Sequence, residues 1–470
     1  MLHFLIDGPA WANRSNPMQA QATLFRGGRL FDGHHFLDAT DLRVAADGTI
    51  SEIGTGLEQH EGEEFVALEG KWLLPGLVDC HVHFREPGLV RKEGYLTGSA
   101  GALHGGVTTV LEIQNNPPLM ENGALLRKKI TDLQGVSRVD YAPYGSLTEA
   151  SLPTLHELVG MTPAVKCFLG CSTGAGGVKD EASMRALFSK AAEVGLKIVA
   201  HCEDNKIMDA AAASASETEA VRHDYMRPVE AEVQSIRDAI RVAGEVGAVL
   251  HVFHISTAEG GRLVAEARKS GQPVTGTTAP HYLIADAEEA AAKHENRFKV
   301  NPSIKSMENQ DGLRELVAAG LLEGVGTDHA PHPLEEKARP YAKAPSGFPS
   351  IDLLLPLLVA IADDSGMSME AALASVTCIP ADEFGLANKG RLEVGADAVL
   401  VVTDPDERFV VDETSLPSKS KWSPYHGREM RARPERVWLR GRVVHVHGEE
   451  PAAPQGRPVG PAASSVRAGV

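Results

Sequence analysis

Between residues 77 and 328 the chain alternates eight times between short apolar runs and segments with helical periodicity. The candidate strands are 77–83, 107–113, 139–144, 163–169, 196–201, 249–254, 273–278 and 323–328. Most of the gaps contain a helix-like segment, such as 180–194, 229–246 and 258–269. Eight strands alternating with helices over about 300 residues predict an α/β fold, a (β/α)8 TIM barrel. A doubly wound open sheet is the alternative, but eight repeats favour closure.

The two flanks of this region resemble each other and differ from its centre. Residues 22–74 and 385–450 read as short strands separated by glycine and aspartate turns. We expect them to form one composite β-domain, a small β-sandwich built from both chain ends, beside a barrel spanning 75–384. Residues 1–21 and 451–470 are predicted to be flexible tails, the second because it is rich in Pro, Ala and Gly.

Composition excludes several classes of function. The 470 residues carry a formal net charge of -17 without basic runs, which argues against nucleic-acid or anionic-membrane partners. No apolar run approaches the roughly 20 residues of a membrane span. The N-terminus lacks the basic region of a signal peptide, and five sparse cysteines indicate a reducing compartment. We therefore expect a cytoplasmic protein with a small-molecule substrate, assembled as a homodimer or higher homo-oligomer.

Polar residues stand at the ends of five of the predicted strands, where the active sites of such barrels lie. They are His81 and His83 on the first strand, Lys166 in the fourth, His201 and His254 ending the fifth and sixth, and Asp328 ending the eighth. Side chains at i and i+2 of a strand share a face, so His81 and His83 point the same way. The set predicts a metal site on one face of the barrel.

Histidine and aspartate ligands without thiolate suit zinc, and manganese or cobalt less well. Two metals need a bridge, and a neutral Lys166 amine can add carbon dioxide to become an anionic carbamate. The alternative for Lys166 is an ion pair with Asp328 or Glu203. Two metals lower the pKa of a shared water and polarise a carbonyl, while Asp328 can carry the proton to a leaving nitrogen. This is metal-assisted hydrolysis of an amide-like bond.

The pattern resembles the amidohydrolase superfamily, and within it class I dihydroorotase. The resemblance runs from about Leu24 to Val446 and rests on the run His-Val-His-Phe-Arg-Glu-Pro-Gly at 81–88 and on Asp-His-Ala-Pro-His at 328–332. It implies two zinc ions per chain. It also implies the ligands: His81 and His83 for the first metal, His201 and His254 for the second, carboxylated Lys166 as the bridge, and Asp328 as first-metal ligand and general base.

The resemblance also implies the substrate contacts, which are Arg85, Asn115, Asn301 and His332. Arg85 would clamp a substrate carboxylate through two parallel hydrogen bonds. The chain departs from the family around these residues: Gln114 precedes Asn115, Ser303 replaces a proline, and Ser350 stands where glycine is usual. The departures concern substrate geometry and leave the metal ligands unchanged.

The implied activity is the interconversion of N-carbamoyl-L-aspartate and L-dihydroorotate in pyrimidine biosynthesis. One rival is another cyclic amidohydrolase, an allantoinase or a hydantoinase (dihydropyrimidinase), which shares the metals but not the acid-binding Arg85. A rival of a different class is a non-catalytic homologue that acts as a structural partner of another pyrimidine enzyme. Such a protein is expected to have lost metal ligands, whereas all six candidates stand in this chain.

Overall fold

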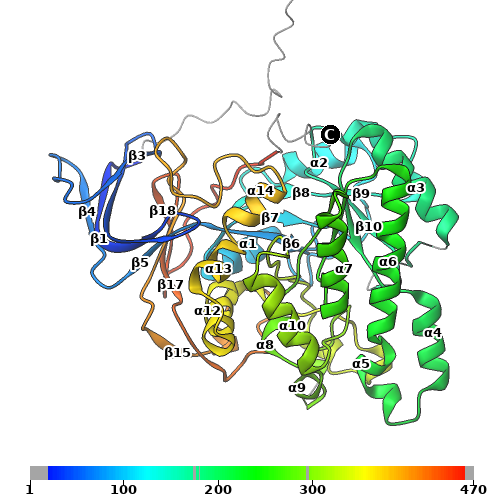
Figure 1. The fold of residues 1–470 in the computed structure, drawn as a ribbon. Coiled ribbons are helices and arrows are strands. Elements are labelled where there is room, and N and C mark those ends of the chain that lie inside the picture. The colour runs from blue at the N-terminus through cyan, green and yellow to red at the C-terminus, as the bar shows by residue number, and fades with distance from the viewer. Residues whose placement is uncertain (1–19, 173–175, 179, 293–295, 461–470) are drawn as a thin grey trace, which may run out of the picture.

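The computed structural model of the chain describes residues 20–172, 176–178, 180–292 and 296–460. Residues 1–19 and 461–470, which make up much of the two predicted tails, lie outside these ranges. In the described part, a barrel with surrounding helices lies beside a smaller β-structure (Figure 1).

The barrel strands follow the predicted order with shorter bounds. They are β6 (Leu77–Val82), β7 (Val107–Glu112), β8 (Asp140–Pro143), β9 (Gly145–Ser146), β10 (Val165–Phe168), β11 (Ile198–His201), β12 (Leu250–Val252) and β13 (Val274–Gly276). All pair in parallel, in the orders β6-β7-β8 and β13-β12-β11-β10-β9. Only Tyr144 separates β8 from β9, so these two sheets meet there.

The predicted eighth strand closes the ring without forming a regular strand. Val325 pairs in parallel with Thr278 after β13, and His329 pairs in parallel with Val82 of β6. The backbone has positive φ angles at Gly324, just before the first bridge, and at Asp328, just before the second (119° and 48°), so the segment is not a continuous extended strand. The predicted (β/α)8 barrel is confirmed, with its seam made by single bridges.

Helices cover the outside of the barrel, and α3, α6, α7 and α10 stand side by side in Figure 1. The predicted helices at 180–194, 229–246 and 258–269 are α3 (Glu181–Val194), α6 (Val229–Val246) and α7 (Ala258–Lys269). The Asp180 side chain caps α3, which ends at Gly195 with φ of 74°. The other α-helices are α1 (Tyr95–His104), α2 (Gly123–Asp132), α4 (Asn205–Ser214), α5 (His223–Met226), α8 (Pro280–Ile284), α9 (Ala287–Ala292), α10 (Met307–Ala318), α11 (Leu334–Lys337), α12 (Leu354–Ser365), α13 (Met369–Ala374) and α14 (Cys378–Glu383).

The smaller β-structure draws its strands from both chain ends, as predicted. Its sheet has the order β18-β17-β14-β5-β1-β2-β3, with β4 paired to β1. The strands are β1 (Thr23–Phe31), β2 (Phe36–Val44), β3 (Ile50–Gly54), β4 (Glu64–Ala67), β5 (Trp72–Pro75), β14 (Leu400–Thr403), β17 (Pro434–Leu439) and β18 (Arg442–Val446), and β15 (Arg408–Val410) pairs with β16 (Glu429–Arg431) outside this sheet. The ring centroids of Phe25 on β1 and Trp438 on β17 lie 5.1 Å apart although two strands separate them, so one sheet folds over its own core. The residue limits predicted for the two domains stay predictions.

A single residue, Gly76, joins the small sheet to the barrel, because β5 ends at Pro75 and β6 begins at Leu77. A Cβ atom at Gly76 would lie 2.1 Å from Thr108 Oγ1 and 2.6 Å from Val399 Cγ1. Only glycine fits this junction, where β6 meets the second barrel strand and the chain that leads into β14.

Residues 451–460, part of the predicted C-terminal tail, form backbone hydrogen bonds with the barrel. This segment lies along the chain leading into β8: Gly456 N donates to Ser137 O at 2.9 Å, Tyr141 N donates to Arg457 O at 3.0 Å, and Val459 N donates to Tyr141 O at 2.9 Å. The composition suggested disorder because few apolar side chains are available, but backbone hydrogen bonds to a neighbouring strand do not require them.

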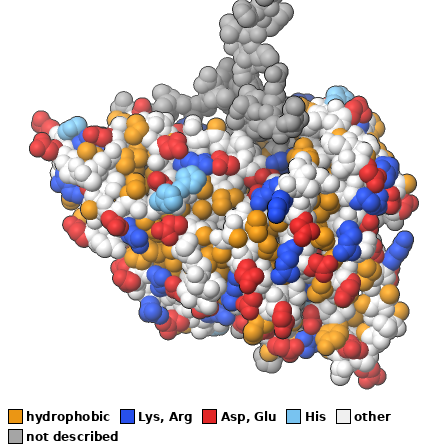
Figure 2. All heavy atoms as spheres, in the orientation of Figure 1, with side chains coloured by type: hydrophobic (Ala, Val, Ile, Leu, Met, Phe, Trp, Pro, Cys, Tyr) orange, Lys and Arg blue, Asp and Glu red, His pale blue; other side chains and the backbone are white. Residues whose placement is uncertain are grey.

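Acidic and basic side chains are interspersed over the face drawn in Figure 2, without a continuous basic patch on that face. No helix in the part of the chain that the structure describes is both long and apolar enough to span a membrane.

A buried charge cluster anchors the C-terminal segment to the barrel. Asp140 Oδ2 lies 2.6 Å from Lys389 Nζ and 2.8 Å from Arg440 Nη1, and Asp140 Oδ1 accepts from Arg457 N at 2.8 Å. Burial by itself raises the pKa of Asp140, but the two cations outweigh burial and lower the pKa below its ordinary value. The resulting stabilisation is present above the pKa of unfolded aspartate and is lost as the pH falls through the lower pKa of the folded state.

Asp140→Asn should lower the free energy of unfolding by about 3–5 kcal/mol, because Lys389 would stay buried without its counter-charge. Urea and thermal unfolding at pH 7 measure the change. The matched control is Asp38→Asn, whose carboxylate is exposed beside Arg29 and should change stability by less than about 1 kcal/mol. Equal small losses in both variants would contradict the role given to Asp140.

Candidate active site and metal centre

One cavity at the carboxyl ends of the barrel strands gathers nine of the ten predicted site residues. Its wall includes His81, His83, Arg85, Asn115, Lys166, His201, His254, Asn301 and Asp328, together with Phe168, Ser172, Val300, Ala330, Ser346 and Gly347. The tenth, His332, is not part of this wall. Residues from distant parts of the sequence therefore meet where barrel enzymes carry their active sites.

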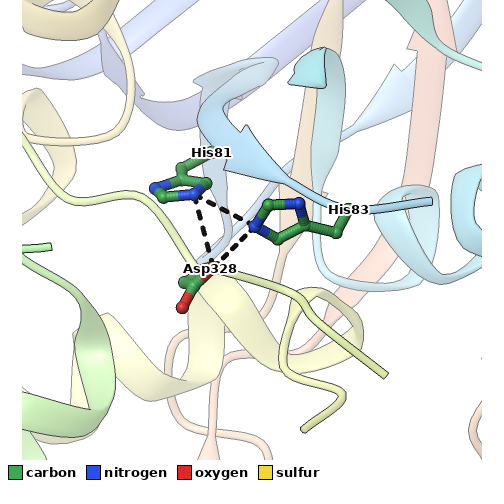
Figure 3. A group of neighbouring side chains, drawn as sticks. All are labelled: His81, His83 and Asp328. Atoms are coloured by element: carbon green, nitrogen blue, oxygen red, sulfur yellow. Dashed lines mark hydrogen bonds and ion pairs between the residues drawn. The ribbon is translucent and has the colours of Figure 1, made fainter. Parts of the chain in front are cut away.

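His81, His83 and Asp328 form a compact group of donor atoms (Figure 3). The two Nε2 atoms lie 3.3 Å apart, and Asp328 Oδ1 lies 3.3 Å from His81 Nε2 and 3.2 Å from His83 Nε2. Burial lowers the pKa of both imidazoles, that of His81 strongly, so their neutral forms are favoured. His83 Nδ1 lies 2.9 Å from Ile113 O and donates its hydrogen there, which leaves the Nε2 lone pair toward Asp328.

His201 and His254 form a second pair of donors. His201 Nδ1 lies 3.1 Å from His254 Nε2, and His201 Nε2 lies 3.0 Å from Glu203 Oε2. Burial alone would raise the pKa of Glu203, but Arg227 and His201 outweigh it and lower the pKa to about 2. The Glu203 carboxylate is therefore ionised and faces His201 Nε2 at ion-pair distance, which favours hydrogen on Nε2 and leaves the Nδ1 lone pair toward His254.

Lys166 is an amine buried without a hydrogen-bond partner. Its side chain is part of the cavity wall, and Nζ is 4.8 Å from the ring centroids of Phe168 and of Phe253. Burial lowers the pKa of Lys166 to about 8. The structure shows no ion pair between Lys166 and Asp328 or Glu203, both of which are described residues.

These residues fit a divalent metal centre. Neutral imidazoles with oriented lone pairs, an aspartate and a readily deprotonated amine are the donors that borderline-soft divalent cations prefer. The unpaired Nζ of Lys166 and the close approach of the ring nitrogens would be unfavourable in a site that held nothing.

Three residues of the cavity wall have left-handed backbone conformations. The φ angles are 64° at Arg85, 42° at His254 and 48° at Asp328. Each costs on the order of 1–3 kcal/mol in a residue other than glycine and persists only where the surroundings enforce it. The strain lies at the strand ends, where the backbone must turn to direct these side chains inward.

Asp79 holds the backbone beside two of the candidate metal ligands, a role that the sequence did not predict. Asp79 Oδ1 accepts from His81 N at 3.1 Å and from Thr327 N at 3.0 Å, so it ties the first strand to the chain leading into Asp328. Burial raises the pKa of Asp79 to about 6. An acidic residue inside the apolar run of β6 was the available signal.

Arg85 is a buried cation that the carboxylates of Asp328, Glu112 and Glu93 stabilise only at a distance, without a direct ion pair. Its side chain is 3% exposed, Nη1 donates to Asn115 Oδ1 at 2.6 Å, and Nε and Nη2 have no partner. Burial lowers the pKa of Arg85 to about 10, so it stays charged at neutral pH. No Asp or Glu of the described residues forms an ion pair with it. The guanidinium therefore offers an anion site in the cavity wall.

His332 lies behind the cavity wall. Lys92 Nζ donates to His332 Nδ1 at 2.8 Å, and His332 Nε2 donates to Ser346 O at 3.1 Å. Lys92 also donates to Glu336 Oε2 at 2.8 Å. Both ring nitrogens are thus engaged by protein groups, and the substrate contact expected for His332 stays a prediction.

The Glu203–His201 contact predicts an effect on metal affinity. Glu203→Gln keeps the size of the side chain but removes the charge that orients His201, so the affinity for a divalent metal should fall about 10–100-fold. Dialysis against graded chelator concentrations, followed by elemental analysis, measures this. Glu259→Gln, at an exposed position of α7, is the control, and equal metal retention in both variants would refute the assignment.

Comparison with known proteins agrees with this geometry. The model of the amidohydrolase family matches residues 72–444. An allantoinase from Rubrobacter xylanophilus is 35% identical over 458 residues, covering 94% of this chain and 98% of that protein. A dihydroorotase from Trichlorobacter lovleyi is 30% identical over 421 residues, covering 90% and 98%. The solved L-hydantoinase (dihydropyrimidinase) from Arthrobacter aurescens has a TM-score of 0.86 at 27% identity, covering 94% and 100%. The chain therefore belongs to the amidohydrolase family.

Proposed function

We propose that this chain is a dihydroorotase, which interconverts N-carbamoyl-L-aspartate and L-dihydroorotate in pyrimidine biosynthesis. The relatives named above, dihydroorotases, allantoinases and hydantoinases, support the hydrolysis of a cyclic amide as the reaction class. The choice among these substrates rests on a single observation: the guanidinium of Arg85 is buried, and its Nε and Nη2 have no hydrogen-bond partner.

Dihydroorotate carries a carboxylate on its ring, whereas allantoin and simple hydantoins do not. A buried cation that lacks a direct ion pair is stabilised when a ligand supplies an opposite charge in hydrogen-bond contact. Asn115 holds one side of the Arg85 fork, and the free Nε and Nη2 hydrogens can bond a carboxylate through two charge-assisted bonds. The cavity wall thus favours an acidic ring over a neutral one.

The metal centre in this proposal consists of two zinc ions per chain. His81, His83 and Asp328 would hold the first ion, His201 and His254 the second, and carboxylated Lys166 both. When bound, such ions lower the pKa of a water molecule and polarise a substrate carbonyl. Lys166 suits carboxylation because only its neutral amine adds carbon dioxide, and its lowered pKa favours that form.

The protein residues carry out the remaining steps of the hydrolysis. Arg85 binds the ring carboxylate and thereby positions the amide carbonyl. Asp328 accepts a proton from the water whose oxygen forms the new bond to the carbonyl carbon. As the bond between that carbon and the ring nitrogen breaks, Asp328 delivers the proton to the nitrogen. Ring closure follows the same steps in reverse.

Allantoinase is the second candidate, and it is favoured by the 35% identity to the Rubrobacter relative. It shares the expected metal ligands and requires no anion site at Arg85. The non-catalytic alternative is opposed by the convergence of six intact candidate ligands on one cavity.

The substrate assignment is tested at Arg85. Arg85→Ala should lower kcat/KM for dihydroorotate by several hundred-fold, because about 3–5 kcal/mol of transition-state binding is lost. Arg85→Lys should also be poor, since an ammonium keeps the charge but not the fork. Arg91→Ala is the control, because Arg91 is exposed and pairs with Glu336. Assays use dihydroorotate, dihydrouracil and allantoin. Turnover of allantoin alone by the wild type, or equal small losses on charged and neutral rings, would favour allantoinase.

The bridge is tested at Lys166. Elemental analysis of the purified wild type should show about two zinc ions per chain. Lys166→Ala should lose activity, and acetate or propionate should restore part of it by replacing the carbamate. Activity that survives complete removal of metal would refute the metal centre, and an unmodified amine in a two-metal structure would refute the carbamate.

A further inference from the structure

His223 begins the short helix α5 and lies outside the barrel, yet its ring contacts a residue of the active-site cavity. His223 Nε2 lies 2.9 Å from Asn301 Oδ1 and 2.9 Å from Val300 O, and both residues belong to the cavity wall. On the other side of the ring, His223 Nδ1 lies 2.6 Å from the hydroxyl of Tyr341. Three residues that are distant in the sequence thus form a continuous chain of hydrogen bonds ending at Asn301.

The chemistry of the partners determines which ring nitrogen carries hydrogen. The Val300 carbonyl can only accept, so His223 Nε2 must be the donor. Burial, with Arg227 and Lys299 nearby, lowers the pKa of His223 to about 3, so the ring is neutral. Nδ1 therefore has a lone pair and accepts from the Tyr341 hydroxyl. A protonated ring would also donate from Nε2, so this part of the assignment does not depend on the charge.

The hydrogen on His223 Nε2 also determines the orientation of the Asn301 amide. A donor at His223 Nε2 requires an acceptor opposite, so the amide oxygen of Asn301 faces the histidine. The flipped amide would set its NH2 group against an N–H group, placing two donors face to face. The NH2 group therefore lies on the other side, where Nδ2 is 3.4 Å from the hydroxyl of Ser172, another residue of the cavity wall.

We propose that His223, held by Tyr341, is a positioning residue that makes Asn301 a hydrogen-bond donor toward the substrate. The amide then recognises a substrate oxygen, such as a ring carbonyl, and disfavours a ring N–H at the same place. This inference deepens the proposed function, because it takes the cavity to bind a cyclic amide, but it holds for dihydroorotate and for allantoin alike.

Two substitutions of His223 distinguish the loss of its hydrogen bond to Asn301 from a general disturbance of the structure. His223→Leu keeps the bulk but cannot donate, so Asn301 is free to turn. KM should rise about 5–10-fold, the value of one hydrogen bond, with kcat changed by less than about 2-fold. His223→Gln retains an N–H donor at the end of its side chain, so it should restore KM to within about 3-fold of the wild type.

The control removes a buried imidazole elsewhere. His445 lies on β18, is 4% exposed, and has no hydrogen-bond partner at either ring nitrogen. His445→Leu should leave KM unchanged, whatever it does to the melting temperature. Equal KM values for His223→Leu and His223→Gln, or the same rise in His445→Leu, would overturn the proposal.

The closing experiment is arranged so that this inference and the proposed function can fail separately. The variants are assayed on L-dihydroorotate and on allantoin; if the wild type hydrolyses allantoin only, the dihydroorotase proposal fails and the KM comparison is made on allantoin. A readout independent of activity is the two-bond ¹⁵N–¹H correlation spectrum of protein labelled at histidine, with the His223 signals identified by their loss in His223→Gln. The neutral Nε2–H form is expected, and hydrogen on Nδ1 alone would overturn the proposal whichever substrate is turned over.

Discussion

The site depends on one physical constraint: charged and titratable side chains are buried, away from water, at the carboxyl end of the barrel. His81, Lys166 and Arg85 are each at most 4% exposed, and burial opposes the charged form of each. The closed barrel keeps these side chains buried although several of their nitrogen atoms have no hydrogen-bond partner in the protein. Imidazole lone pairs, an amine with a lowered pKa and a guanidinium without a direct ion pair are unfavourable alone but complementary to cations and to an acidic ring. The folded protein therefore leaves polar groups without hydrogen-bond or ion-pair partners, and these groups favour the binding of metal ions and an acidic ligand.

A second ring of residues fixes how the site residues point. Asp79 joins the backbone of His81 to that of Thr327, Glu203 orients His201, and the carbonyl of Ile113 orients His83. None of these groups needs to touch a substrate. The contacts to the rings favour one tautomer and one direction for His83 and His201, and Asp79 fixes the backbone of His81, which is the preorganisation that metal sites and active sites require.

The sequence predicted the barrel and the candidate ligands because both depend on local patterns. Strand periodicity, helix amphipathicity and polar residues at strand ends each involve residues close together in the sequence, so they can be recognised from the sequence alone. Three features did not follow from such patterns. The eighth strand forms only single bridges because Gly324 and Asp328 bend its backbone, residues 451–460 pair through backbone groups that composition does not report, and both ring nitrogens of His332 contact protein groups, Lys92 and Ser346. Each of these depends on contacts between segments far apart in the sequence, and so does the orientation of Asn301 by His223.

The junction at Gly76 has a consequence for synthesis on the ribosome. The strand before it, β5, pairs with β14, so that Trp72 meets Thr403 and Pro75 meets Leu400. The first barrel strand follows after one residue. A nascent chain therefore emerges with β5 unpaired on that side until the whole barrel and then β14 have been translated. The small sheet can close only after the C-terminal strands have been synthesised, and a chain truncated before β14 would expose the edge of β5 permanently.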